Sequence, residues 1–87
     1  MAWYEFIWLD DFTEGNIEHL AQHGFTPEDF EFVFANYEGE GISDATGNPM
    51  RFGHTEDGRS AAIVFEWIEK DITVLPVTMF PVPERKS

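Results

Sequence analysis

The stretch Met50–Phe80, MRFGHTEDGRSAAIVFEWIEKDITVLPVTMF, decides the fold that we predict for this chain. It contains runs of β-branched and aromatic residues that are typical of strands, separated by two breaks that are typical of turns. The first break is Asp57-Gly58, a dipeptide common in tight hairpins, and the second is Glu69-Lys70-Asp71. We therefore predict three antiparallel strands, and we expect Pro76 to mark a sheet edge or an early end of pairing.

Two helices are predicted before this stretch. Thr13 can cap the first, and Gly24 following His23 is typical of a helix end. The second opens with Thr26-Pro27, a capping hydroxyl followed by a proline at the first helical position. Its apolar residues recur at helical spacing, so this helix is predicted to be the main cover of the sheet. They are Phe30, Val33, Phe34 and Tyr37.

The remaining segments complete the predicted architecture. Trp3–Leu9 is apolar and aromatic, and we predict either an extended segment or a further strand laid against the sheet. Glu38–Pro49 is rich in Gly and small polar residues and is predicted to be a loop, whereas residues 81–87 are predicted to be a flexible tail. The prediction is a single α+β domain over residues 1–87, with two N-terminal helices packed on a three- or four-stranded antiparallel meander.

The composition is strongly acidic. Seventeen Asp and Glu face five Lys and Arg, giving a formal net charge of −12, and the first 49 residues contain no Lys or Arg. A field of this sign repels phosphate backbones and suits either solubility or a basic protein partner. The absence of cysteine excludes disulfides and thiolate metal sites, and no basic leader or membrane span is recognisable. We therefore expect a cytoplasmic protein that does not contact membranes.

The histidine pair His19 and His23 is the candidate metal site. Residues four apart lie on one face of a helix, and two imidazoles with a carboxylate can hold zinc. The metalloprotease pattern also needs a Glu directly after the first histidine, and Leu20 stands there. We interpret both histidines as polar-face residues, with His23 stabilised by the negative end of its helix. We therefore predict no metal and no cofactor.

A second constellation consists of Arg51, His54, Arg59 and Glu66. Hairpin geometry can bring these side chains to one edge of the sheet. Cleavage of RNA by its 2′-hydroxyl needs a base, an acid and a cation that stabilises charge on the phosphate. His or Glu would supply the first two and Arg the third. The alternative is that both arginines pair with neighbouring acids and that His54 is an exposed surface residue.

Several short motifs along the chain are similar to those of one family. They are Trp8, Asn16–His19, His23–Glu28, Val33-Phe34, Gly53, Thr55–Arg59 and Ile63–Phe65. In this combination they resemble BrnT-like toxins. The resemblance implies a RelE-like α+β ribonuclease, the toxin half of a type II toxin–antitoxin pair, neutralised by a small DNA-binding antitoxin. It carries over Arg59 as the first site residue and His23 as the next.

The chain also departs from that family. Members carry Arg-rich segments in and after the last strand, whereas Leu75–Pro81 contains no cation here. Three functions therefore stay open. The first is a toxin-like ribonuclease acting on RNA through Arg59, with His54 or His23 in proton transfer. The second is a non-catalytic acidic module that binds a basic protein. The third is a homodimer built on exposed aromatics such as Phe32 and Trp3.

Overall fold

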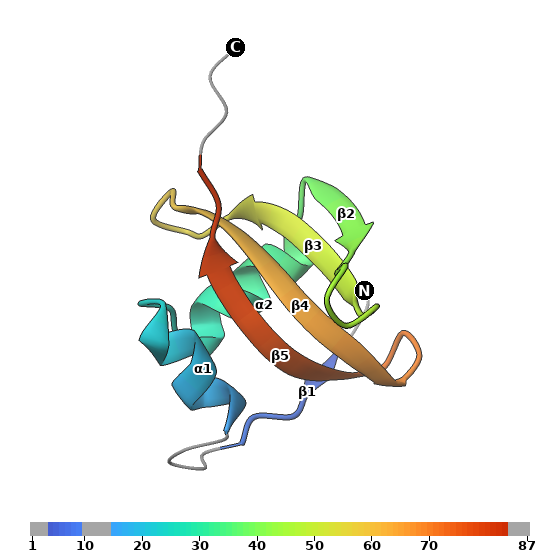
Figure 1. Cartoon of the computed structure of the whole chain (residues 1–87). Helices are drawn as coiled ribbons and strands as arrows, with labels where there is room; N and C mark the ends of the chain where they lie inside the picture. The colour runs from blue at the N-terminus through green and yellow to red at the C-terminus, as the bar shows by residue number, and fades with distance from the viewer. Residues whose placement is uncertain (1–3, 10–14, 84–87) are drawn as a thin grey trace.

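The computed structural model describes residues 4–9 and 15–83. In these residues two short helices accompany a five-stranded mixed sheet, an α+β fold (Figure 1). Neither of these helices is long and apolar enough to cross a membrane. The elements in chain order are β1 (Glu5–Phe6), α1 (Asn16–Gln22), α2 (Pro27–Ala35), β2 (Gly39–Ile42), β3 (Pro49–His54), β4 (Ser60–Glu69) and β5 (Thr73–Pro81).

The predicted sheet of three or four antiparallel strands is wrong. The strand order is β1-β5-β4-β3-β2, and β1 pairs with β5 in parallel, with Glu5 opposite Thr73 and Phe6 opposite Val74. The fifth strand is β2, which lies inside the segment predicted to be a loop and pairs antiparallel with β3. Its two glycines weaken the local strand signal, and the pairing with β3 overrides that weakness.

The prediction for Pro76 holds on one side of β5 and fails on the other. β5 lies between β1 and β4, and its pairing with β4 continues as far as Pro81. The register between the two strands shifts at Val64/Phe65, so that one residue of β5 is left without an opposite partner. The unpaired residue is Val77, whereas the backbone of Pro76 faces the β1 side, because its carbonyl accepts from Asn16 there, so the missing N–H of this proline takes no bond from the β4 ladder. On the other side of β5 the pairing with β1 has already ended at Val74.

Both predicted helices are present. α1 ends where His23-Gly24 indicates, with Gly24 in the left-handed region at φ 82°. α2 begins with a complete capping box, in which the Thr26 hydroxyl accepts from the Asp29 N–H and the Asp29 carboxylate accepts from the Thr26 N–H. The N-cap of α1 is Gly15 and not the predicted Thr13, which lies outside the described residues, as do residues 84–87 of the predicted tail.

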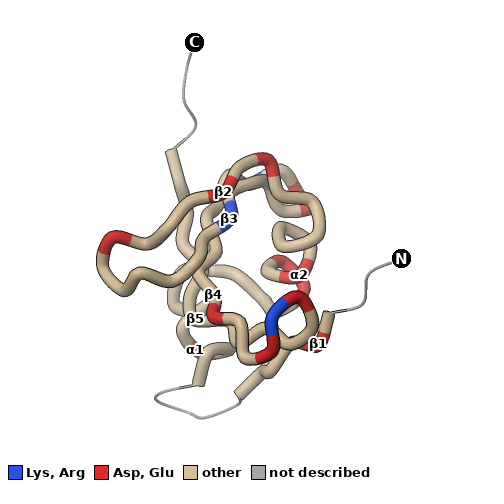
Figure 2. The backbone as a smooth tube through the Cα atoms, turned by 90° about the vertical axis from the view of Figure 1, so that its right-hand side faces the viewer, with Lys and Arg blue, Asp and Glu red and all other residues tan. Residues whose placement is uncertain are grey.

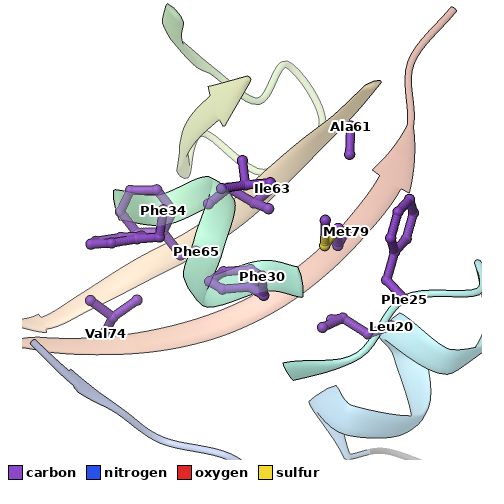
Figure 3. Close-up of a cluster of buried hydrophobic side chains, with 10 residues drawn as sticks. Leu20, Phe25, Phe30, Phe34, Ala61, Ile63, Phe65, Val74 and Met79 are labelled. Carbon is purple, nitrogen blue, oxygen red and sulfur yellow. The ribbon is translucent and has the colours of Figure 1, made fainter. Parts of the chain in front are cut away.

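The core lies between the helices and one face of the sheet. Figure 3 shows Phe30 and Phe34 of α2 lying over Ile63 and Phe65 of β4. Tyr37, which was expected on the same helix face, follows the helix and is 41% exposed. Edge-to-face ring contacts bind this layer together, each adding about 0.5–1.5 kcal/mol to the burial itself. The central ones are Phe34–Phe65 at 5.0 Å, Tyr4–Phe34 at 4.9 Å and Trp8–Phe30 at 5.4 Å.

The opposite face of the sheet carries no described helix, because α1 and α2 contribute to the same core cluster (Figure 1). Register places two rows of side chains on this helix-free face. One row is Phe52, Ala62 and Phe80, and the other is Met50, Val64 and Thr78. Ala62 and Val64 are buried even so. Larger neighbours across the strands therefore shield the middle of this face.

Candidate functional site

The β3–β4 hairpin holds Arg59, the first residue that the resemblance carries over. The predicted Asp57-Gly58 turn is present, with Gly58 at φ 88°. Thr55 closes the hairpin, because its N–H donates to the Arg59 carbonyl at 2.9 Å and its hydroxyl oxygen accepts from the Arg59 N–H at 3.0 Å. The Thr55 hydroxyl in turn donates to the Asp57 carboxylate. The base of the Arg59 side chain is thereby fixed.

The Arg59 guanidinium joins this hairpin to the loop between α1 and α2. Its Nε donates to both oxygens of Asp57 at 3.0 and 3.2 Å, and its Nη1 donates to the Gly24 carbonyl at 2.9 Å. Nη2 donates to Asp29 Oδ2 at 3.1 Å, and the guanidinium carbon lies 4.7 Å from the Phe25 ring centroid. Every nitrogen of this group thus has a partner inside the chain. Its charge is matched by two carboxylates.

Asp57 is the described acid whose pKa is clearly perturbed. The hydrogen bond from the Thr55 hydroxyl, followed by that from Arg59, lowers the pKa of this carboxyl below its ordinary value of 3.8. The carboxylate is therefore charged at neutral pH and binds Arg59 as an ion pair. Arg59 also forms an ion pair with Asp29, which caps α2. One guanidinium therefore balances a carboxylate of the hairpin and a carboxylate at the start of the helix.

Arg51 lies under the end of α2. Its Nη1 donates to the Phe34 carbonyl at 3.0 Å, a site where the helix dipole favours a cation. The guanidinium carbon lies 4.3 Å from the Phe34 ring centroid and 4.2 Å from that of Tyr37. Its Nε is buried without a hydrogen bond to a described residue, and Glu40 Oε2 is 3.6 Å away. The side chain is only 12% exposed, so this cation is enclosed by the protein.

The other predicted site residues do not converge on one centre. His54 Nδ1 lies 2.8 Å from Glu38 Oε2, beside β2. His23 is the exposed cap residue of α1, next to the Gly24 carbonyl that Arg59 binds. Glu66 is exposed and stands six residues along β4 from Ser60, the register partner of His54. At about 3.3 Å per residue this is roughly 20 Å.

Strand parity separates the constellation further. Arg51 is opposite Ile63, which faces the helices, whereas His54 and Glu66 have the other parity and face the helix-free side. Of the five predicted residues, the structure therefore brings Arg59 to Gly24, the residue that follows His23, and disperses the rest. His19 does not join them, because its Nδ1 lies 3.4 Å from the Val77 carbonyl. Among residues 4–9 and 15–83, no three His, Cys, Asp or Glu side chains gather into a metal site.

Asn16 is the polar residue that sequence reasoning missed. It is 4% exposed, and its Oδ1 accepts from the Leu9 N–H at 2.8 Å. Its Nδ2 donates to the Ile7 carbonyl at 2.7 Å and to the Pro76 carbonyl at 3.0 Å. It thus ties the segment after β1 to β5. A small open pocket of about 200 Å³ lies beside it, lined by Leu9, Asn16, His19, Leu75, Pro76 and Val77.

The described surface is acidic and its cations are few. Figure 2 shows Asp and Glu, in red, spread along the chain, with blue positions much rarer. The Lys and Arg of the described residues are Arg51, Arg59 and Lys70. The first two are held by carboxylates and aromatic rings of the chain itself. Acids also flank β2, where Glu38, Glu40 and Asp44 follow one another closely.

None of the family models that were searched matches this chain, and neither a curated protein nor a solved structure matches it.

Proposed function

We propose that this chain is a non-catalytic acidic module that binds a basic protein partner. The observation that carries the proposal is the state of its two arginines in the sheet region. Arg59 spends its three nitrogens on Asp57, Asp29 and Gly24, and Arg51 is enclosed under α2. A phosphate would therefore have to compete with Asp57 and Asp29 for the charge of Arg59, and Arg51 is too enclosed to bind one. The excess acids keep a negative field that attracts a basic surface.

Titration of the labelled chain with charged ligands tests this function. The ligands are a lysine-rich peptide, a glutamate-rich peptide of equal length and an RNA oligonucleotide, each followed by fluorescence anisotropy. We expect saturable binding of the lysine-rich peptide alone. It should weaken about tenfold or more from 0.01 M to 0.1 M salt, because the Debye length falls from about 30 to about 10 Å. Binding that does not respond to salt, or a preference for RNA, contradicts the proposal.

One observation favours the BrnT-like ribonuclease as a second candidate. Arg59 donates to the carbonyl of Gly24, the residue that follows His23, and Arg59 and His23 are the two residues that the resemblance carries over. A nuclease working there would have to release Arg59 from Asp57 and Asp29 when RNA binds. The test is cleavage of free RNA and of mRNA on translating ribosomes by the purified chain. Cleavage that Arg59→Ala and His23→Ala both abolish would establish this candidate, whereas intact RNA in both settings rejects it.

A further inference from the structure

The outer edge of β2 is open in the described sheet, because β2 is its last strand. The Ser43 N–H donates to the Asn48 carbonyl at 2.8 Å, which makes residues 43 and 48 a hydrogen-bonded pair. Bonded and non-bonded pairs alternate along an antiparallel ladder. The pairs Gly41–Met50 and Gly39–Phe52 are therefore bonded, and the pairs of residues 40–51 and 42–49 are not. Proline at 49, which has no N–H, fits this alternation.

The alternation decides which backbone groups point outward. Glu40 and Ile42 direct their N–H and C=O groups away from β3, toward the open edge. A strand of another molecule can therefore form a ladder with these two residues without disturbing the sheet. Their side chains share the face that carries Arg51. Ile42 is 64% exposed and Glu40 carries a side chain that is 59% exposed.

On the helix-free face of this edge, β2 contributes few side-chain atoms. Gly39 and Gly41 have no side chains there, and the ring of Phe52 lies across them. A Cβ added at Gly41 would lie 3.3 Å from the Phe52 ring, and one added at Gly39 would lie 3.8 Å from it. Phe52 is thus the outermost side chain at this edge on that face. An incoming strand would meet an aromatic ring there, and an aromatic ring over glycine backbone is a favourable cross-strand arrangement.

We propose that the basic partner binds by adding an extended segment to the edge of β2. This deepens the proposed function and rests on it. The geometry fixes the chemistry of three partner residues. The one opposite Glu40 is Lys or Arg, the one opposite Ile42 is aliphatic, and the one between them is a large apolar side chain that reaches Phe52. A second copy of the chain fits the edge poorly, because pairing would bring its own glutamates and a charge of −12 against the same acids.

Amide hydrogen exchange measured by NMR tests this mode of binding directly. In the free chain, the Gly41 and Ser43 amides should exchange slowly and the Glu40 and Ile42 amides quickly. The probes are synthetic peptides with Val-Phe-Lys or its reverse, Lys-Phe-Val, between lysines, which cover both strand polarities. At saturation we expect the Glu40 and Ile42 amides to slow by about tenfold or more. The controls place proline where an N–H would donate to β2, at valine in the antiparallel Val-Phe-Lys peptide and at phenylalanine in the parallel Lys-Phe-Val peptide.

Variants of the chain localise the partner. Ile42→Pro removes an outward N–H and leaves the bonds to β3, whereas Ile42→Ala keeps that N–H. We expect the proline variant to bind at least about tenfold more weakly than the alanine variant, since an edge proline cannot donate to the added strand. Protected amides of β4 and β5 show that the variant is folded. If it is not, a charge-matched pair of variants decides the question.

Each variant of that pair loses three negative charges, one variant beside β2 and the other beside the β4–β5 turn. One variant neutralises Glu38, Glu40 and Asp44 beside β2, and the other neutralises Glu66, Glu69 and Asp71 beside the β4–β5 turn. A larger loss of binding in the first supports strand addition. Salt-sensitive binding that weakens equally in both, without protection at Glu40 and Ile42, overturns strand addition but keeps the acidic module. If no lysine-rich ligand binds at any salt concentration, the proposed function itself fails.

Discussion

Replacement of Asn16 by alanine is the most informative test of the fold. The side chain is buried at the junction of β1, α1 and β5, and it makes three hydrogen bonds to backbone groups, one of them 60 residues away at Pro76. Alanine leaves the Leu9 N–H and the carbonyls of Ile7 and Pro76 without this partner. No other described side chain makes these bonds. The variant should therefore loosen the attachment of β1 more than any other part of the sheet.

The expected loss is about 3 kcal/mol. A hydrogen bond contributes about 1 kcal/mol net, and a buried group that loses its partner costs about 1–3 kcal/mol. The bond to Pro76 is buried, so its loss costs an amount in the upper part of that range. The bonds to Leu9 and Ile7 are half-buried, so water can replace them in part and their loss costs less. A domain of 87 residues has a total stability of about 4–13 kcal/mol. The melting temperature should fall by about 12–24 °C.

The assay is urea unfolding together with hydrogen exchange, and Asn36→Ala is the matched control. Asn36 makes one exposed side-chain bond, to the Phe32 carbonyl at 2.9 Å, so its loss should cost less than about 1 kcal/mol. In Asn16→Ala the amides of Glu5 and Ile7, which donate to the carbonyls of β5 and the turn before it, should lose protection first. Equal stabilities of the two variants would refute the role assigned to Asn16.

Three further outcomes follow from the structure. Gly53→Ala should cost about 1–3 kcal/mol in thermal unfolding and Gly41→Ala less than about 1 kcal/mol, because both added Cβ atoms meet a neighbour at 3.3 Å but only the first meets rigid backbone. The stability difference between wild type and Asp57→Asn, measured as melting temperature against pH, should be present at neutral pH. It should shrink as pH falls through 3.8 and below, because the lowered pKa of Asp57 stabilises the fold only while its carboxylate is charged and bound to Arg59. In urea unfolding, Arg51→Ala should have a free energy of unfolding about 1–2 kcal/mol lower than that of Arg51→Met, because methionine keeps the apolar packing under the rings. Equal free energies of unfolding would contradict that packing.

Sequence reasoning located the features that depend on neighbours in the chain. The Thr26-Pro27 start of α2 and the Asp57-Gly58 turn both have their causes within four residues, so the sequence displays them. The strand alternative for Trp3–Leu9 is confirmed at β1, but the sequence shows neither its bounds nor its parallel pairing. This strand is two residues long, and its parallel partner Thr73–Val74 stands near the other end of the chain. A strand this short has no periodicity, and its position depends on Asn16 and on the aromatic core.

The candidate site shows the same division. The interpretation in which the arginines pair with neighbouring acids describes their contacts, and the Asp57–Arg59 pair follows from the hairpin turn. The contact of Arg59 with Asp29 does not follow from it, because it requires α2 to dock against the hairpin. The sequence indicates Arg51 as a ligand for phosphate because it is a cation. Its enclosure by Phe34 and Tyr37 becomes visible only when the helix is placed over β3.

The parallel pairing of β1 with β5 also sets the order of events during biosynthesis. A ribosome releases Glu5–Phe6 several seconds before Thr73–Val74, at synthesis rates of about 5–20 residues per second. Until β5 emerges, β1 has no strand to join, and Leu20 and Phe30 lack part of the layer that buries them. Between the emergence of β1 and that of β5, the aromatic residues around Phe30 therefore lack part of their cover. This interval is when chaperones, or other nascent chains, have access to them.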